Sequence, residues 1–143
     1  MKRFYLLVVF VIIGAITSGR NYTELQKWRE KGLPSTIKSG ITVEVYDLKK
    51  ASNDGIDINI RSHNMSSKTV TELSVKVWLW KGEGVYVEEL LLVAGGSSFD
   101  YLNSGRDNYF PGKNRYHRID AVKYDEVRKI QLEISRIVSK RVR

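Results

Sequence analysis

Apolar and polar residues alternate along most of the chain from position 41 onward, and the clearest alternation lies at residues 69–81, TVTELSVKVWLWK. Side chains on a β-strand point alternately to opposite faces of its sheet. One face of this segment is aliphatic and consists of Leu73, Val75, Val77 and Leu79. The other face is mixed and consists of Ser74, Lys76, Trp78 and Trp80. We therefore expect a long central strand whose aliphatic face lies in a core.

The same period of two recurs in shorter segments on both sides of this strand. Residues 41–46 and 56–61 alternate around an Asn-Asp-Gly turn at positions 53–55, which predicts a hairpin. Further strands are expected at residues 85–93, 114–122 and 130–134, with a short one around Phe99 and Leu102. With no crossover helices between them, these segments predict an all-β fold. We expect an antiparallel immunoglobulin/fibronectin-III-like sandwich of about seven strands.

The N-terminus has the layout of a targeting segment. Residues 1–19 carry two basic residues, an apolar run from Phe4 to Ile16, and then small residues. This order is typical of a secretory signal peptide, and the run is shorter than the roughly 20 residues of a membrane span. We expect export to the periplasm or the extracellular space. If the signal is not cleaved, it would instead anchor the protein to the membrane.

Residues 20–40 change to helical signals. Thr23 and Gln26 form a capping-box pattern, Gly32 suits a helix end, and Pro34 prevents continuation. We expect a short amphipathic helix at residues 21–34, followed by a linker. The predicted organisation is therefore a signal peptide or signal anchor (1–19), a short helix and linker (20–40), a β-sandwich domain (41–138) and a basic tail (139–143).

The chain carries a formal net charge of +8. Most basic residues are interspersed with acidic ones along the predicted strands, which is typical of solvated sheet faces. A basic group remains near the C-terminus, formed by Arg136, Lys140, Arg141 and Arg143. If this group binds an anion, an anionic membrane surface or an envelope polymer fits an exported protein better than nucleic acid does.

No pattern of catalytic or metal-binding residues stands out. His117 lies near aspartates in sequence but has no nucleophile motif, and residues 53–57 lack the spacing of a calcium loop. Glu88 and Glu89 are adjacent on a predicted strand, so they point to opposite faces and cannot form an acid pair. With no cysteine in the chain, thiolate chemistry is also excluded. We predict a non-enzymatic protein without metal or cofactor.

Aromatic side chains are the best candidates for binding. Trp78 and Trp80 share one strand face, and other rings lie on nearby elements. The candidate binding residues are Trp78, Trp80, Tyr86, Tyr101 and Tyr109. Such rings pack between sheets, form protein interfaces or stack on sugars, and the sequence leaves all three roles open.

The segment IDINIRSHNMSSKTVTELSVKVWLW, followed by FPGKNRY, resembles small exported bacterial β-sandwich domains, including the FxLYD-like group and immunoglobulin-like domains of unknown function. The resemblance covers residues 55–137. The matching positions are Asn64, Ser66, Lys68, Val70, Pro111 and Gly112. It implies an extracytoplasmic interaction module with no catalytic residues to transfer.

These observations favour an exported or membrane-tethered module that binds another cell-envelope protein. One alternative is a carbohydrate-binding accessory module that uses the exposed aromatic residues on a polysaccharide. Another is a secreted inhibitor or immunity protein that displays its loops, for example residues 97–108.

Overall fold

The computed structural model describes residues 28, 30 and 32–141, in two compact units, Met1–Gly32 and Leu33–Arg143. In the first unit, Trp28 and Glu30 are helical and Trp28 is buried. The predicted signal segment (1–19) and most of the predicted helix at residues 21–34 lie outside the described residues. Arg143 lies outside them too.

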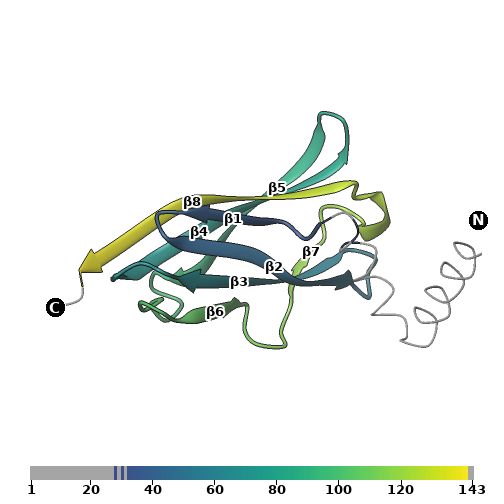
Figure 1. The fold of residues 1–143 in the computed structure, drawn as a ribbon. Coiled ribbons are helices and arrows are strands. Elements are labelled where there is room, and N and C mark those ends of the chain that lie inside the picture. Colours follow the sequence, from purple (N-terminus) through teal and green to yellow (C-terminus); the bar gives the residue numbers. More distant parts are fainter. Residues whose placement is uncertain (1–27, 29, 31, 142–143) are drawn as a thin grey trace, which may run out of the picture. The chain divides into compact units, whose positions relative to one another are not determined.

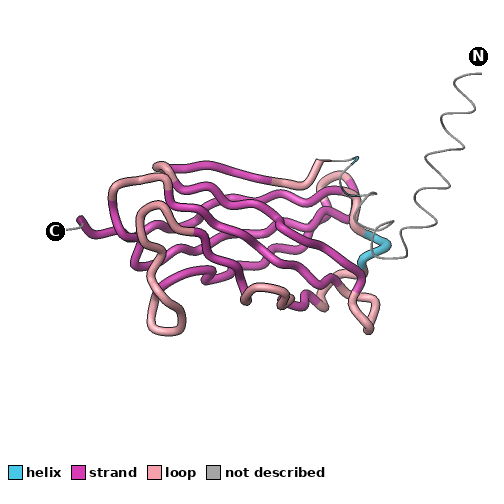
Figure 2. The backbone as a smooth tube through the Cα atoms, turned by 60° about the horizontal axis from the view of Figure 1, so that its bottom comes forward, coloured by secondary structure: helices cyan, strands magenta, loops and turns pink. Residues whose placement is uncertain are grey.

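The described part of the second unit is built from antiparallel strands, which confirms the all-β prediction. Its elements are β1 (Ser35–Lys38), β2 (Ile41–Lys50), β3 (Ile56–Asn64), β4 (Lys68–Gly82), β5 (Val85–Gly95), β6 (Asp107–Phe110), β7 (His117–Ile119), the 3-10 helix η1 (Tyr124–Glu126) and β8 (Lys129–Arg141). They form two sheets, which Figure 1 shows as two layers. One sheet has the order β1-β2-β3-β6, with β7 also pairing with β3, and the other has the order β5-β4-β8. In Figure 2 the strands of both sheets run along a common direction, as in aligned sheet packing.

Strand β4 is the central strand of the three-stranded sheet, as residues 69–81 predicted. It pairs with β5 along one side and with β8 along the other. Its aliphatic row, Leu73, Val75, Val77 and Leu79, is 0% exposed. Opposite this row, β2 and β3 contribute Val43, Val45, Ile58 and Ile60, all buried. The core therefore lies between the two sheets, where alternating residues of each sheet point inward.

The hairpin between β2 and β3 also forms where it was expected. Asp54 has a positive φ of 69°, and the amide of Gly55 donates a hydrogen bond to Asn53 Oδ1 at 3.1 Å. An asparagine side chain that caps its own turn in this way fixes the reversal locally.

Two strands differ from the sequence prediction near the start of the domain and in its middle. The predicted linker contains β1, which pairs with β2 through a tight turn at Ser39 and Gly40, both with positive φ. A strand of four mostly exposed residues has too little alternation to be recognised from sequence. Phe99 and Leu102 do not form a strand; Leu102 makes an isolated bridge to Val70, and the strand β6 begins at Asp107 instead.

The predicted strand at residues 114–122 is reduced to three residues, and β8 is longer than predicted. The segment before β7 crosses the outer face of β3, where the Asn59 amide donates hydrogen bonds to the carbonyls of Gly112 (2.9 Å) and Arg115 (2.6 Å). These two carbonyls are engaged by the Asn59 side chain, and the strand begins only after them, at His117. At the other end, β8 continues past Val138 to Arg141, so part of the predicted basic tail is paired with β4.

Candidate functional site

Three of the five predicted binding residues come together on the outer face of the three-stranded sheet. We call Trp78, Trp80 and Tyr86 the aromatic cluster. The register places Trp80 directly opposite Tyr86, which brings the Tyr86 ring 5.1 Å from Trp78 and 4.8 Å from Trp80, centroid to centroid. The two indole rings are 6.0 Å apart. These spacings are those of interacting aromatic pairs, so the three rings act as one unit.

The faces of the indole rings are already occupied by neighbouring side chains. Tyr86 stacks on Trp78 at an interplanar angle of 20°. The ammonium of Lys76 lies 5.9 Å from the centre of the Trp78 ring, and that of Lys129 lies 5.7 Å from the centre of the Trp80 ring. Both are cation–π distances. The cluster is therefore a packed group of rings rather than an open row of flat faces.

Lys76 is also held by Glu88 on the neighbouring strand. The ammonium and the Glu88 carboxylate are 3.0 Å apart, and the hydrogen bond to Glu88 raises the pKa of Lys76. Burial lowers this pKa, but the effect is smaller. The charge next to Trp78 is thus fixed as an ion pair on the sheet surface.

The two indole N–H groups of the cluster find no acceptor among residues 32–141. In the described part of the chain, Nε1 of Trp78 and Nε1 of Trp80 are both buried and without a hydrogen-bond partner. Tryptophan N–H groups usually find a partner when they are buried, and an unpaired one costs free energy. This arrangement is unusual for rings that serve only to pack the fold.

An exposed aliphatic residue on β5, Leu90, extends the aromatic cluster on the same face, and Val85 is exposed on the other face of the strand. Leu90 is 62% exposed and Val85 is 54% exposed, beside Tyr86 at 44%. Within residues 32–141, β5 forms a strand ladder with β4 alone, so its other side is a sheet edge. Sequence analysis missed Leu90 and Val85. The signal was the run LLLV at residues 90–93, which is apolar on both faces of its strand.

A hollow adjoins the cluster at the β4–β5 turn. Its volume is about 460 Å³, and its lining is formed by Trp80, Gly82, Glu83, Gly84, Arg128 and Lys129. Trp80 therefore belongs both to the cluster and to the lining of this hollow. Together, the cluster and Leu90 form an apolar surface on the outer face of the sheet, which we call the β5 surface; Val85, next to Tyr86 on the strand, is exposed on the opposite face.

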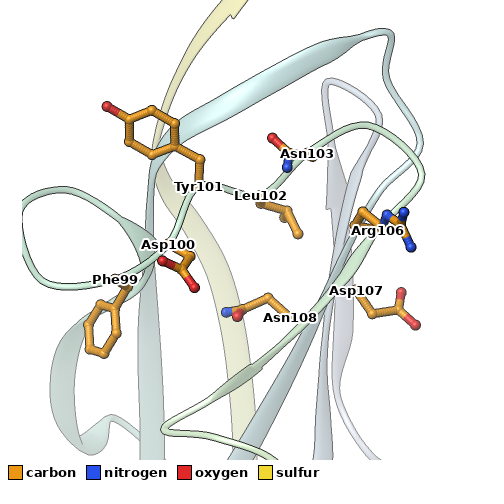
Figure 3. Close-up of a pocket in the computed structure, with 8 residues that line it drawn as sticks. All are labelled: Phe99, Asp100, Tyr101, Leu102, Asn103, Arg106, Asp107 and Asn108. Carbon is orange, nitrogen blue, oxygen red and sulfur yellow. The ribbon is translucent and has the colours of Figure 1, made fainter.

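Tyr101 lies near the opposite end of β4, on the loop between β5 and β6. This loop borders a pocket of about 680 Å³ lined by residues 99–103 and 106–108 (Figure 3). The loop is braced by Asn64, whose amide donates a hydrogen bond to the Leu102 carbonyl at 3.0 Å. Backbone bonds between Leu102 and Val70, both 2.9 Å, add to this bracing. The pocket is therefore held by fixed backbone.

Tyr109 belongs to the other sheet. It lies on β6, where its ring meets that of Tyr46 edge to face at 5.0 Å. A hydrogen bond from Arg61 to Tyr109 raises the pKa of Arg61. Tyr109 thus takes part in a packed polar group on the outer face of the five-stranded sheet, and it is not brought to the aromatic cluster.

The predicted basic group is divided among separate environments. Arg136 pairs with Glu72 at 3.6 Å. The Lys140 ammonium lies 5.0 Å from the centre of the Tyr101 ring. Arg141 is directly opposite Lys68 in the β4–β8 ladder.

The histidines take part in packing and surface pairing. His63 Nδ1 contacts Asp107 Oδ1, and the His117 ring lies 5.4 Å from that of Phe110. Among the described residues, no group of three or more histidine, aspartate or glutamate side chains is arranged to hold a metal ion. In the same part of the chain, no helix has the length and apolar character to cross a membrane.

Comparison with known proteins gives this chain no relative from which a site could be transferred. No protein-family model, curated protein or solved structure matches it.

Proposed function

We propose that the protein is a non-enzymatic binding module, and that its β5 surface docks an extended segment of another protein. The observation that carries this proposal is the coincidence of a strand edge with exposed Tyr86 and Leu90, which share the outer face of β5. Exposed apolar residues that gather in one place mark interaction sites more often than those scattered singly.

The edge of β5 suits strand addition. Natural sheets protect free edges with lysine, proline or a covering element. The sequence of β5, VYVEELLLVAG, contains neither lysine nor proline. Near its end, β5 is engaged by the Asn108 amide, which donates a hydrogen bond to the Val93 carbonyl. An added strand would pair with the earlier part of β5 and place alternate side chains against Tyr86 and Leu90.

The charges on β5 indicate what kind of segment fits. Its only charged residues are Glu88 and Glu89, and Glu88 is neutralised by Lys76. In the described residues Glu89 has no ion pair. A segment that alternates apolar residues with lysine or arginine complements this edge. A second copy of the chain would instead bring another acidic β5.

A carbohydrate fits the β5 surface less well. Sugars stack on open aromatic faces. Here the Trp78 face carries Tyr86 at 5.1 Å and the Lys76 ammonium at 5.9 Å, so little face remains open.

Saccharide binding is a second candidate function, and it would use the pocket lined by residues 99–103 and 106–108. There Phe99 and Tyr101, 40% and 49% exposed, accompany amide and carboxylate side chains. A polysaccharide pull-down with Tyr101→Ala tests this role. Retention that is equal for the variant and the parent would contradict it.

The strand order supports an immunoglobulin-like or fibronectin-III-like assignment, which we also propose. In such folds the second strand pairs with the first and with a strand from later in the chain, and the third strand pairs with the penultimate one. Here β2, β3 and β4 correspond to the first, second and third strands of such a fold. Strand β3 pairs with β2 and with the later strand β6, and β4 pairs with β8, which takes the place of the penultimate strand. The last strand of such a fold, which would follow β8, has no counterpart in the described residues.

Export is part of the proposal and rests on the sequence of residues 1–19. Protease protection in intact cells tests it, because an exported domain becomes accessible once the outer barrier is permeabilised while a cytoplasmic marker stays protected.

Site-specific photo-crosslinking tests the β5 surface. A photoreactive residue at Tyr86 should yield an adduct with a second protein in the cells that produce this chain. The same residue at Tyr46 should yield little, although Tyr46 is exposed to almost the same degree (45% against 44%). Mass spectrometry should place the crosslink in a segment that alternates apolar and basic residues.

Leu90→Lys and Ile37→Lys are a matched pair of variants that test whether the crosslink depends on the β5 surface. Leu90 and Ile37 are both 62% exposed, so Leu90→Lys and Ile37→Lys change stability by no more than about 0.5 kcal/mol. Only Leu90→Lys should abolish the Tyr86 adduct. Equal loss in both variants, or an adduct made of two copies of this chain, would overturn the proposal.

A further inference from the structure

A second hollow lies where the two sheets meet, at the end of β4 opposite the aromatic cluster. Its volume is about 240 Å³. The β1–β2 turn, the β3–β4 turn and β8 contribute its polar lining, which is Ser39, Ser66, Ser67, Lys68 and Ser139. The remaining lining residues are aliphatic, and none is acidic. Four serines and one lysine therefore border a space large enough for a small anion.

Like charges face each other beside this hollow, where Lys68 belongs to the lining and Arg141 lies next to it in the β4–β8 ladder. Lys68 and Arg141 are directly opposite each other in the β4–β8 ladder. Ser139 lines the hollow, and Arg141 follows it by two residues on the same strand, so both belong to one face of the sheet. Like charges in opposite positions destabilise a sheet. Among residues 32–141, neither Lys68 nor Arg141 has an acidic partner within salt-bridge distance.

The hydroxyls of the hollow differ in how far they are engaged. Ser66 Oγ donates a hydrogen bond to Asn64 Oδ1 at 2.6 Å and accepts one from the Lys68 amide at 3.2 Å. This bonding fixes the β3–β4 turn. Within the described chain, the hydroxyls of Ser67 and Ser139 make no hydrogen bond, so both can donate to a ligand.

We propose that this hollow binds a phosphate group, with Lys68 and Arg141 supplying charge and Ser67 and Ser139 supplying hydrogen bonds. A phosphate between Lys68 and Arg141 would turn a repulsive pair into an attractive triad. Charge-assisted hydrogen bonds to phosphate are among the stronger ones in proteins. The phosphate group belongs either to a small soluble molecule or to a phospholipid headgroup.

Titration of the purified protein with inorganic phosphate tests the site. Amide NMR signals of Ser66, Ser67 and Lys68 should shift saturably. Lys68→Gln should weaken this binding about tenfold, and Ser139→Ala about threefold. Lys113→Gln removes an equal charge from an exposed loop residue and should leave binding unchanged. No saturable shift at these amides, or equal weakening by Lys113→Gln, would overturn the proposal.

Vesicles distinguish the two sources of phosphate. If the ligand is a headgroup, the protein should sediment with phosphatidylglycerol vesicles but not with phosphatidylcholine vesicles, and Lys68→Gln should reduce sedimentation. If inorganic phosphate binds but phosphatidylglycerol vesicles do not retain the protein, the phosphate belongs to a soluble molecule. The β5 surface takes no part in either assay, so the outcome is independent of the docking proposal.

Discussion

The two edges of the three-stranded sheet, β5 and β8, differ in the charge they carry and in how they are protected. Strand β5 presents Leu90 and Tyr86 to solvent and carries only acidic charge. Strand β8 carries Lys129, Arg136, Lys140 and Arg141, and its apolar residues Leu132 and Ile134 point into the core. Both strands pair with β4 and have similar lengths, so backbone geometry does not explain the difference.

The comparison indicates that charge on an edge strand decides which contacts it accepts. Lysine and arginine on β8 make the addition of another strand unfavourable, because an incoming backbone would have to displace hydrated charges. On β5 the exposed residues gain free energy when they are covered. This difference is the reason we propose protein docking at β5 and anion binding at the end of β8.

The largest effect is expected from the strand that both edges share. Leu79→Ala removes a side chain that is 0% exposed and should lower the free energy of unfolding by about 2–5 kcal/mol. Urea denaturation measures this change. If both edges depend on β4, crosslinking at β5 and phosphate binding at β8 should be lost together at the lower urea concentration at which the variant unfolds. If only one of the two activities is lost there, the two edges fold independently.

A smaller effect is expected at the β5 end alone. Trp80→Ala removes a half-buried ring and its contacts with Trp78 and Tyr86, which should cost about 2 kcal/mol. Thermal melting and crosslinking at Leu90 measure the two consequences. Phosphate titration is the control and should be unchanged, because Trp80 lies at the other end of β4.

At the β8 end, stability and binding should move in opposite directions. Arg141→Glu replaces a like-charge pair with an opposite-charge pair across from Lys68, which should raise stability by about 0.2–1 kcal/mol. The same change should abolish phosphate binding. A variant that loses stability would contradict the assignment of Lys68 and Arg141 as a repulsive pair.

The smallest effect at neutral pH concerns Tyr116, which lies just before β7 and serves as a reference remote from both edges. Burial, followed by the hydrogen bond to Asp47, raises the pKa of Tyr116 to about 12 from its ordinary 10.0. Between pH 10 and 12 the unfolded chain therefore releases this proton while the folded chain keeps it, so stability falls as pH rises. Tyr116→Phe should lessen the fall, as denaturation at several pH values would show. Equal slopes in the two proteins would contradict this origin.

The core row and the main hairpin could be predicted from sequence because their signals are local. Leu73, Val75, Val77 and Leu79 occur at every second position, and this period alone places them on one face. The turn at residues 53–55 is likewise encoded in its own side chains. Strand β1 and the short β6 have no comparable signal, since they are defined by the strands they pair with.

The candidate site was predicted only in part. Trp78 and Trp80 could be placed on one face from their spacing, but the Tyr86 position depends on the register of β5 against β4. Tyr109, an equally plausible candidate by sequence, packs on Tyr46 on the other sheet.

By itself, the sequence determined which residues of each strand face inward, because alternation is a property of the chain within a few residues. Only the tertiary structure decided which strands are neighbours and therefore which edges stay open. Lys68 and Arg141 are far apart in sequence, and only the pairing of β4 with β8 places them opposite each other. Leu90 is likewise one of three consecutive leucines in the chain, and it is exposed because the register of β5 against β4 places it opposite Lys76 on the outer face of the sheet.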